Sequence, residues 1–136
     1  MLQAADLAQA TLFKGLPEKE LKSAAAAMKE VTIPAGKEVS ITGQSGVAFS
    51  VILEGEAEVR TVDGRTRRLN PGDHFGEMAL LEGEGRSADV TAASDLRLAA
   101  LVEWGFKDFL ARHPEVAFRL LQTLSRRLRE AEAAHR

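Results

Sequence analysis

The sequence predicts an α+β domain, an antiparallel and jelly-roll-like β-roll of about eight strands with helices at both ends of the chain. Three observations lead to this fold class. Apolar residues recur at helical spacing near both termini. Between them, short runs of alternating apolar residues are separated by frequent turns, which favours an antiparallel roll over a βαβ sheet. The length of 136 residues suits one domain spanning 1–136.

Residues 1–30 are predicted to be a helical lead-in. The alanine-rich stretch from Leu2 to Ala10 is long enough for a short helix. Pro17 suits the first position of a second helix, because its missing N–H would have no intrahelical partner there. Apolar residues then recur at helical spacing, which predicts a helix from about Pro17 to Lys29. They are Leu21, Ala24, Ala25 and Met28.

Residues 31–102 are predicted to form the roll. Asp63-Gly64 is a strong signal for a two-residue hairpin turn, and Asn70 to Asp73 contains the proline and glycine of another turn. The expected strands lie at Val31–Ile33, around Val39 and Ile41, at Val47–Leu53, around Ala57 and Val59, at Arg65–Leu69, at Ala88–Ala92 and at Leu96–Val102.

Residues 103–136 are predicted to form two C-terminal helices. The first begins near Trp104, and the second begins at Pro114. The second carries a stripe of apolar residues at helical spacing: Val116, Leu120, Leu121, Leu124 and Leu128. Such a stripe can pack on the roll, cover a ligand, or pair with a second copy of the helix, which makes a homodimer through residues 114–130 possible.

Composition and charge exclude several classes of protein. The net charge of −2 argues against a general nucleic-acid binder. The absence of cysteine excludes disulfides and thiol catalysis and fits a reducing compartment. The N-terminus lacks the basic start and apolar run of a signal peptide, and no stretch approaches the ~20 apolar residues that a membrane span requires. We therefore expect a cytoplasmic module without a membrane span.

Residues 75–88 contain the densest set of candidate binding groups. Gly76 has no side chain, so a ligand can approach the backbone there closely. The amides of Glu77, Met78 and Ala79 would be free donors at the start of a short helix, where an anion is favoured. Arg86, which follows a loop of glutamates and glycines, can offer a forked positive charge to a phosphate.

Glu77 indicates that the ligand carries a neutral hydroxyl as well as an anionic group. A carboxylate would repel an anion, but it can accept a hydrogen bond from a neutral hydroxyl such as a ribose 2′-OH. The residues therefore indicate a site for a small sugar phosphate. The same residue types also fit a site without function, in which the apolar neighbours are core and Arg86 pairs with Glu77 or Glu84, so residue types alone leave both interpretations open.

The sequence from Phe75 to Leu81, with Arg86-Ser87-Ala88 and Val90, closely resembles the phosphate-binding cassette of cyclic nucleotide-binding domains. The resemblance extends over nearly the whole chain. It includes a lead-in similar to the family's N-terminal helical segment, a similar central hairpin, the glycine and aspartate before the cassette, and a similar start of the last helix. These are Leu12–Leu16, Ile52–Val59, Gly72-Asp73 and His113-Pro114-Glu115.

The resemblance implies a role for each cassette residue. Arg86 would pair with the exocyclic oxygens of the cyclic phosphate, and Glu77 would bind the ribose 2′-OH beside the backbone of Gly76. A serine at the position of Ser87 resembles the bacterial catabolite activators, which use cyclic AMP. Family members that favour cyclic GMP often carry threonine at this position, so the resemblance favours cyclic AMP. The implied ligand-binding set is Phe75, Gly76, Glu77, Met78, Ala79, Arg86, Ser87 and Ala88, with Val59 and Leu69 as weaker candidates for the apolar wall of the purine pocket.

The resemblance implies a regulatory sensor whose C-terminal helices move when cyclic AMP or cyclic GMP binds. The effector domain or partner protein it would control is not part of this chain. Catabolite activators continue into a helix-turn-helix domain, whereas this sequence ends at Arg136, so direct nucleic-acid binding is not expected.

Three alternatives are weighed against the sensor. Gly85 stands where the family commonly has proline, and residues 43–48 lack the family's Gly-Asp pattern. These departures support a degenerate domain that serves as an interaction platform without nucleotide. An enzyme and a metal site are not expected, because His74, His113 and His135 are scattered and no nucleophile arrangement is present. We expect His74 itself to lie at the surface or in a turn. The arginines after Asp63-Gly64 and at 126, 127 and 129 are interpreted as solvated faces paired with acidic residues.

Overall fold

The computed structural model of the chain describes residues 2–39, 49–61, 64–77, 88–101 and 103–134. The helices in this part of the chain are α1 (Ala4–Leu7), α2 (Glu18–Ala27), α4 (Glu103–Arg112) and α5 (Pro114–Ala134). Helix α1 is shorter than expected. Pro17 is the residue before α2 and not its first residue, because its ψ of 147° is extended while its carbonyl accepts the N–H groups of Glu20 and Leu21.

The described strands form two antiparallel sheets. They are β1 (Lys29–Ile33), β2 (Phe49–Glu54), β3 (Ala57–Thr61), β4 (Thr66–Leu69), β5 (His74–Phe75), β6 (Ala88–Ala92) and β7 (Leu96–Leu101). One sheet has the order β1-β7-β2-β5, and the other has the order β4-β3-β6. The predicted α+β class with an antiparallel β-roll is therefore confirmed.

Two details of the predicted strands differ from the structure. Around Val39 the described residues form one isolated bridge, between Glu38 and Thr91, and residues 40–48 lie outside the described part. The β3–β4 loop is one residue longer than a two-residue hairpin, because the Thr61 N–H donates to the Arg65 carbonyl at 2.8 Å. Gly64 has a φ of 88°, the left-handed conformation that the last residue of a three-residue loop requires.

Strand β2 lies between two apolar cores, and its alternating side chains reach both. Phe49 and Val51 belong to the core that β7 shares with the helices at both ends of the chain. Ile52 belongs to the second core, which fills the inside of the roll between the two sheets. Because both faces of β2 are covered, its first four residues are all buried and do not alternate between buried and exposed positions.

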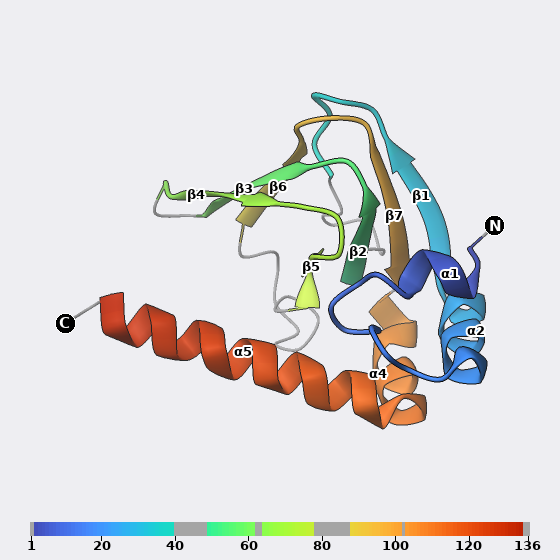
Figure 1. Cartoon of the computed structure of the whole chain (residues 1–136). Helices are drawn as coiled ribbons and strands as arrows, with labels where there is room; N and C mark the ends of the chain where they lie inside the picture. Colours follow the sequence, from blue (N-terminus) through green and yellow to red (C-terminus); the bar gives the residue numbers. More distant parts are fainter. Residues whose placement is uncertain (1, 40–48, 62–63, 78–87, 102, 135–136) are drawn as a thin grey trace.

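The arrangement in Figure 1 places helix α5 beneath both sheets. It runs from the end of α4 past the strands of the β4-β3-β6 sheet, and the C-terminus lies beyond them. Helices α1 and α2 lie at the other end of the roll, on the side of α4. Among the described residues, none of the helices combines the length and apolar character needed to cross a bilayer.

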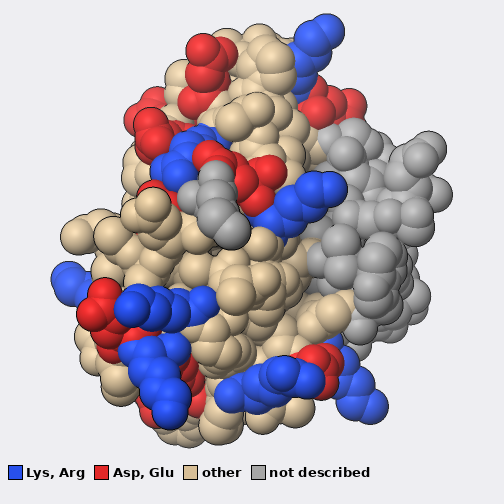
Figure 2. Space-filling model, turned by 90° about the vertical axis from the view of Figure 1, so that its right-hand side faces the viewer, with Lys and Arg blue, Asp and Glu red and all other residues tan. Residues whose placement is uncertain are grey.

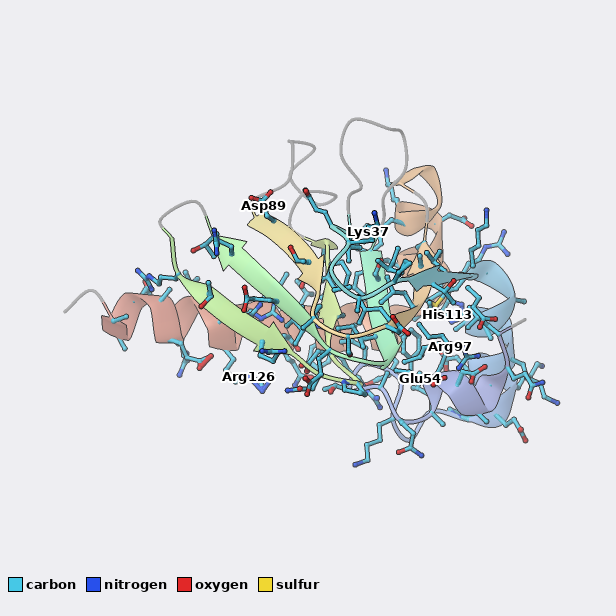
Figure 3. All side chains as sticks on the ribbon, turned by 90° about the horizontal axis from the view of Figure 1, so that it is seen from above. Lys37, Glu54, Asp89, Arg97, His113 and Arg126 are labelled. Carbon is cyan, nitrogen blue, oxygen red and sulfur yellow. The ribbon has the colours of Figure 1, made fainter. Side chains whose placement is uncertain are left out.

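One arginine ties the N-terminal lead-in to the roll. Arg97 of β7 donates to Glu30 Oε2 of β1 at 2.6 Å, to Asp6 Oδ1 of α1 at 3.0 Å and to Glu54 Oε2 of β2 at 3.1 Å. Figure 3 shows Arg97 and Glu54 side by side. The pKa of Asp6 and that of Glu30 both lie below their ordinary values, chiefly because each carboxylate accepts a hydrogen bond from Arg97. Arg97 thus joins α1, β1 and β2 to β7.

Candidate functional site

The segment leading into residues 75–88 is held in place by strand β2. The Gly72 N–H donates to the Ile52 carbonyl at 2.8 Å, and the Ile52 N–H donates to the Asp73 carbonyl at 2.9 Å. Asp73 closes the preceding turn, because its Oδ2 accepts the Asn70 N–H at 2.8 Å. Strand β5 then continues the pairing with β2, with Phe75 opposite Ser50. The entry to the predicted site is therefore fixed relative to the sheet.

Gly76 changes the direction of the chain after β5. Its φ of 94° lies in a region that other residues rarely adopt, so glycine is required here for backbone conformation. Glu77 follows in helical conformation, and the rest of the expected short helix lies outside the described residues. Met78, Ala79, Gly85, Arg86 and Ser87 lie outside the described residues.

Glu77 is a buried carboxylate with two positively charged or chargeable neighbours. Its side chain is only 3% exposed, and its Oε1 lies 2.9 Å from His74 Nδ1 and 2.9 Å from Arg127 Nη1. Burial by itself raises the pKa of the Glu77 carboxyl, but the contacts with His74 and Arg127 outweigh burial, so the pKa lies below its ordinary value of 4.5. The side chain predicted to accept a ribose hydroxyl is thus held ionised inside the protein.

His74 corrects the expectation of a surface or turn residue. It lies in β5, is only 3% exposed, and its ring packs against that of Phe49 with centroids 5.5 Å apart. Within the described residues, Nδ1 has no aligned hydrogen-bond partner, although Glu77 Oε1 lies 2.9 Å away. The strand buries His74 because its cross-strand partner, Val51, lies in the apolar core.

Arg127 is the site residue that the sequence interpretation missed. The sequence places Arg127 in a basic run interpreted as solvated, but its side chain is only 29% exposed on helix α5 and donates to Glu77 Oε1. A signal was present in the sequence. Arg127 follows Leu120 by seven residues, so the two share one face of the helix. A charge on that apolar face indicates a buried acidic partner.

Of the remaining predicted site residues that the structure describes, three belong to the inner core and Ala88 lies at the start of a strand. Val59 and Leu69 are 7% and 2% exposed and belong to the same apolar cluster as Phe75. Ala88 begins strand β6 and is paired with Thr61 of β3. Both candidates for the purine wall therefore lie in the same apolar core as Phe75.

The apolar stripe of α5 divides between two environments. Val116 and Leu120 are buried in the core that the helices share, and Leu124 is partly buried against it. Leu121 and Leu128 are more than half exposed, as is Phe118. Packing on the roll therefore accounts for only part of the stripe.

Of the other arginines expected to pair with acidic residues, Arg68 does so, and Arg112, which lies outside the expected basic runs, is paired as well. Arg68 of β4 lies 3.3 Å from Glu56, and Arg112 of α4 lies 2.9 Å from Asp108. Figure 2 shows acidic and basic side chains interspersed on the face that carries the N-terminal helices.

A comparison with models of protein families identifies the family of the domain. The model for the cyclic nucleotide-binding domain matches residues 30–113, which is more than half of the chain. The chain belongs to the cyclic nucleotide-binding domain family. The matched range ends at His113, so the Arg127–Glu77 contact joins a residue beyond this range to one inside it.

Similar proteins include both bacterial and fungal members of this family. The chain is 36% identical over 126 residues to the cyclic AMP receptor protein of Thermus thermophilus, covering 89% of this chain and 58% of that protein. It is 36% identical over 106 residues to the cAMP-dependent protein kinase regulatory subunit of Aspergillus fumigatus, covering 76% of this chain and 26% of that protein. The chain thus spans less than two thirds of either relative.

A solved structure shows the same cyclic nucleotide-binding fold. The crystal structure of the Thermus thermophilus catabolite activator protein superimposes with a TM-score of 0.79 at 36% identity, covering 90% of this chain and 60% of that chain. The similarity includes more of this chain than the matched family range, and so extends to helices outside residues 30–113.

Proposed function

We propose that this domain is a regulatory sensor that binds cyclic AMP at residues 75–79 and 86–88. The observation that carries the proposal is the buried, ionised carboxylate of Glu77 directly after Gly76, at the start of the cassette that the family uses. A buried carboxylate held ionised can accept a hydrogen bond from a ribose hydroxyl. The similarity to a cyclic AMP receptor protein supports cyclic AMP as the ligand, with cyclic GMP as the weaker one.

In the proposed binding mode, the ribose, the cyclic phosphate and the purine each contact a different set of residues. The ribose 2′-OH donates to Glu77, and the cyclic phosphate lies at the amides of Met78 and Ala79 and against the guanidinium of Arg86. Phe75, Ser87 and Ala88 border the phosphate and ribose. The purine lies against the apolar side chains that include Val59 and Leu69.

We also propose that nucleotide binding is transmitted through helix α5. Arg127 occupies Glu77 Oε1, the atom to which the ribose hydroxyl would donate. When the hydroxyl takes this position, Arg127 leaves it, and the second half of α5 is released from the roll. The ligand shifts the equilibrium only by its difference in affinity for the two arrangements. Amide exchange in α5 that is unchanged at saturating cyclic AMP would contradict this mechanism.

A calorimetric titration with cyclic AMP and cyclic GMP tests the binding function. Cyclic AMP should bind more tightly, and Arg86→Ala should weaken its binding by about 2–5 kcal/mol, as expected when a desolvated charge loses its partner. Arg126→Ala removes an exposed arginine from α5 and serves as the control. Failure of the unmodified chain to bind either nucleotide would favour the degenerate domain that serves only as an interaction platform.

The proposed role is that of a sensor and not of an enzyme. The similar proteins are a receptor protein, kinase regulatory subunits and cyclic nucleotide-gated channels, which supports a module that regulates another activity. The regulated output would belong to an effector domain or partner protein outside these 136 residues.

Exposed apolar residues on α5 favour a further proposal, self-association of two copies through this helix. Phe118, Leu121 and Leu128 are 57%, 64% and 61% exposed, which leaves an apolar strip facing solvent in the single chain. Light scattering should show a dimer that Leu121→Glu converts to a monomer. Gln122→Glu adds the same charge at an adjacent exposed position and should leave the dimer intact. A monomer before any substitution would contradict the proposal.

A further inference from the structure

Among the described residues at the cassette, His74 is the one buried ionisable group that the proposed binding mode does not use. Its Nδ1 lies 2.9 Å from Glu77 Oε1, and its side chain is 4% exposed. Within the described residues this nitrogen has no aligned hydrogen-bond partner, which is unusual for a buried polar atom. A buried imidazole aimed at the ribose-binding carboxylate therefore calls for a role.

We infer that His74 is a positioning residue for the Glu77 carboxylate, and that protonation of its ring strengthens the binding of a cyclic nucleotide. The inference rests on the proposed function, because it concerns the same carboxylate. A protonated ring holds Oε1 in place when Arg127 leaves it, so the carboxylate keeps a positive partner while it accepts the ribose hydroxyl.

The charges around the ring fix the sign of the effect. Glu77 faces the imidazole from the start of the cassette, and Arg127 approaches the same oxygen from α5. Strand β2 faces it with the apolar side chains of Phe49 and Val51. While Arg127 contacts Oε1, its positive charge disfavours a proton on the His74 ring. A bound anionic nucleotide favours that proton. Departure of Arg127 and arrival of the nucleotide therefore both promote uptake of a proton by His74.

Glu77 itself does not produce a pH dependence near neutrality. Its pKa lies below 4.5, because the contacts with His74 and Arg127 outweigh burial, so the carboxylate stays ionised from pH 6 to pH 8. Uptake of up to one proton on binding changes affinity by at most tenfold for each pH unit. We expect cyclic AMP to bind about three- to tenfold more tightly at pH 6 than at pH 8.

The first test is a set of calorimetric titrations with cyclic AMP at pH 6, 7 and 8. His74→Gln keeps a polar side chain but cannot gain a proton, so its affinity should be the same at all three values. A purely structural role would change the stability of this variant without removing the pH dependence. Equal affinities of the unmodified chain at pH 6 and pH 8 would overturn the inference and leave the proposed function standing. No binding of cyclic AMP or cyclic GMP at any pH would overturn both.

The second test works even if His74→Gln fails to fold. The chain has three histidines, so His113→Gln combined with His135→Gln leaves His74 as its only imidazole. His113 is a matched control, because it is also 3% exposed and its Nδ1 lies 3.4 Å from Glu20 Oε1, at the α4–α5 junction. Titrations in two buffers of different ionisation enthalpy measure the proton taken up. Uptake near pH 7 should persist in the double variant, and its loss would assign the proton to another histidine and refute the role of His74.

Discussion

Replacing Arg127 by methionine removes the charge that α5 presents to Glu77 and keeps most of the side-chain stem. Breaking a fully buried ion pair costs about 3–5 kcal/mol, whereas a hydrogen bond to a charged group contributes about 1.5–3 kcal/mol. Arg127 is 29% exposed, and His74 remains beside the same oxygen, so the lower range applies. We expect Arg127→Met to lower the free energy of unfolding by about 2 kcal/mol in the absence of nucleotide. For a domain of this size, the melting temperature should fall by about 4–8 °C.

Thermal unfolding followed by circular dichroism at pH 7 measures this change. Arg126→Met is the matched control, because Arg126 is the exposed neighbour on the same helix, labelled in Figure 3, and an exposed substitution should change the melting temperature by about 1 °C. The lowered pKa of Glu77 sets the pH range. Its contribution is present above 4.5 and is lost as the pH falls through the lower folded value, so the difference caused by Arg127→Met should shrink below about pH 4. Equal melting temperatures of the two variants at pH 7 would refute the role assigned to the Arg127–Glu77 pair.

Two further predictions concern the roll. Arg97→Met should lower the melting temperature at pH 7. This difference should shrink as the pH falls below 3.8, because the pKa values of Asp6 and Glu30 lie below 3.8 and 4.5 and the hydrogen bonds from Arg97 need both carboxylates ionised. A difference that grows as the pH falls would contradict this. Gly55→Ala should lower the free energy of unfolding by about 3 kcal/mol in denaturant titrations, because Gly55 has a φ of 90° and a Cβ there would collide with the Asp95 carbonyl. Gly64→Ala is the control, because Gly64 has a φ of 88° but open space around a Cβ, and it should cost about 1 kcal/mol.

The sequence predicts the fold well because local signals and tertiary packing agree along most of the chain. The turn before the cassette contains the residues that its geometry needs, and Asp73 closes it onto Asn70. Helical spacing predicts α2 and α5 because each presents one apolar face to the same core. The prediction of Pro17 as the first helical residue is wrong by one position, because proline suits the end of the preceding extended segment as well as a first turn.

The partners of the candidate site could not be predicted in the same way. Gly76 and Glu77 are recognisable because the cassette is a local motif. Arg127 reaches Glu77 across 50 positions of sequence, and the contact depends on how α5 lies against the roll. His74 is polar and follows an aspartate, which is typical of a turn, but pairing with β2 turns it into the core. Local chemistry thus predicts the ligand class, whereas the groups that regulate the carboxylate depend on tertiary packing.

Two anchors on α5 determine how release of Arg127 would act on the helix. Arg119 donates to the carbonyls of Lys14 at 2.6 Å and Leu12 at 3.3 Å, so the first half of α5 is tied to the N-terminal segment and not to the cassette. Eight residues later, Arg127 ties the second half to Glu77. If the ribose hydroxyl replaces Arg127, the energy of that contact opposes binding, and a variant without it binds more tightly. Arg127→Met should therefore raise the affinity for cyclic AMP by up to about thirtyfold, the factor that corresponds to about 2 kcal/mol, while it lowers the stability of the free protein. A weaker affinity in this variant would show instead that Arg127 stays beside the bound nucleotide, and the proposed release of α5 would have to be abandoned.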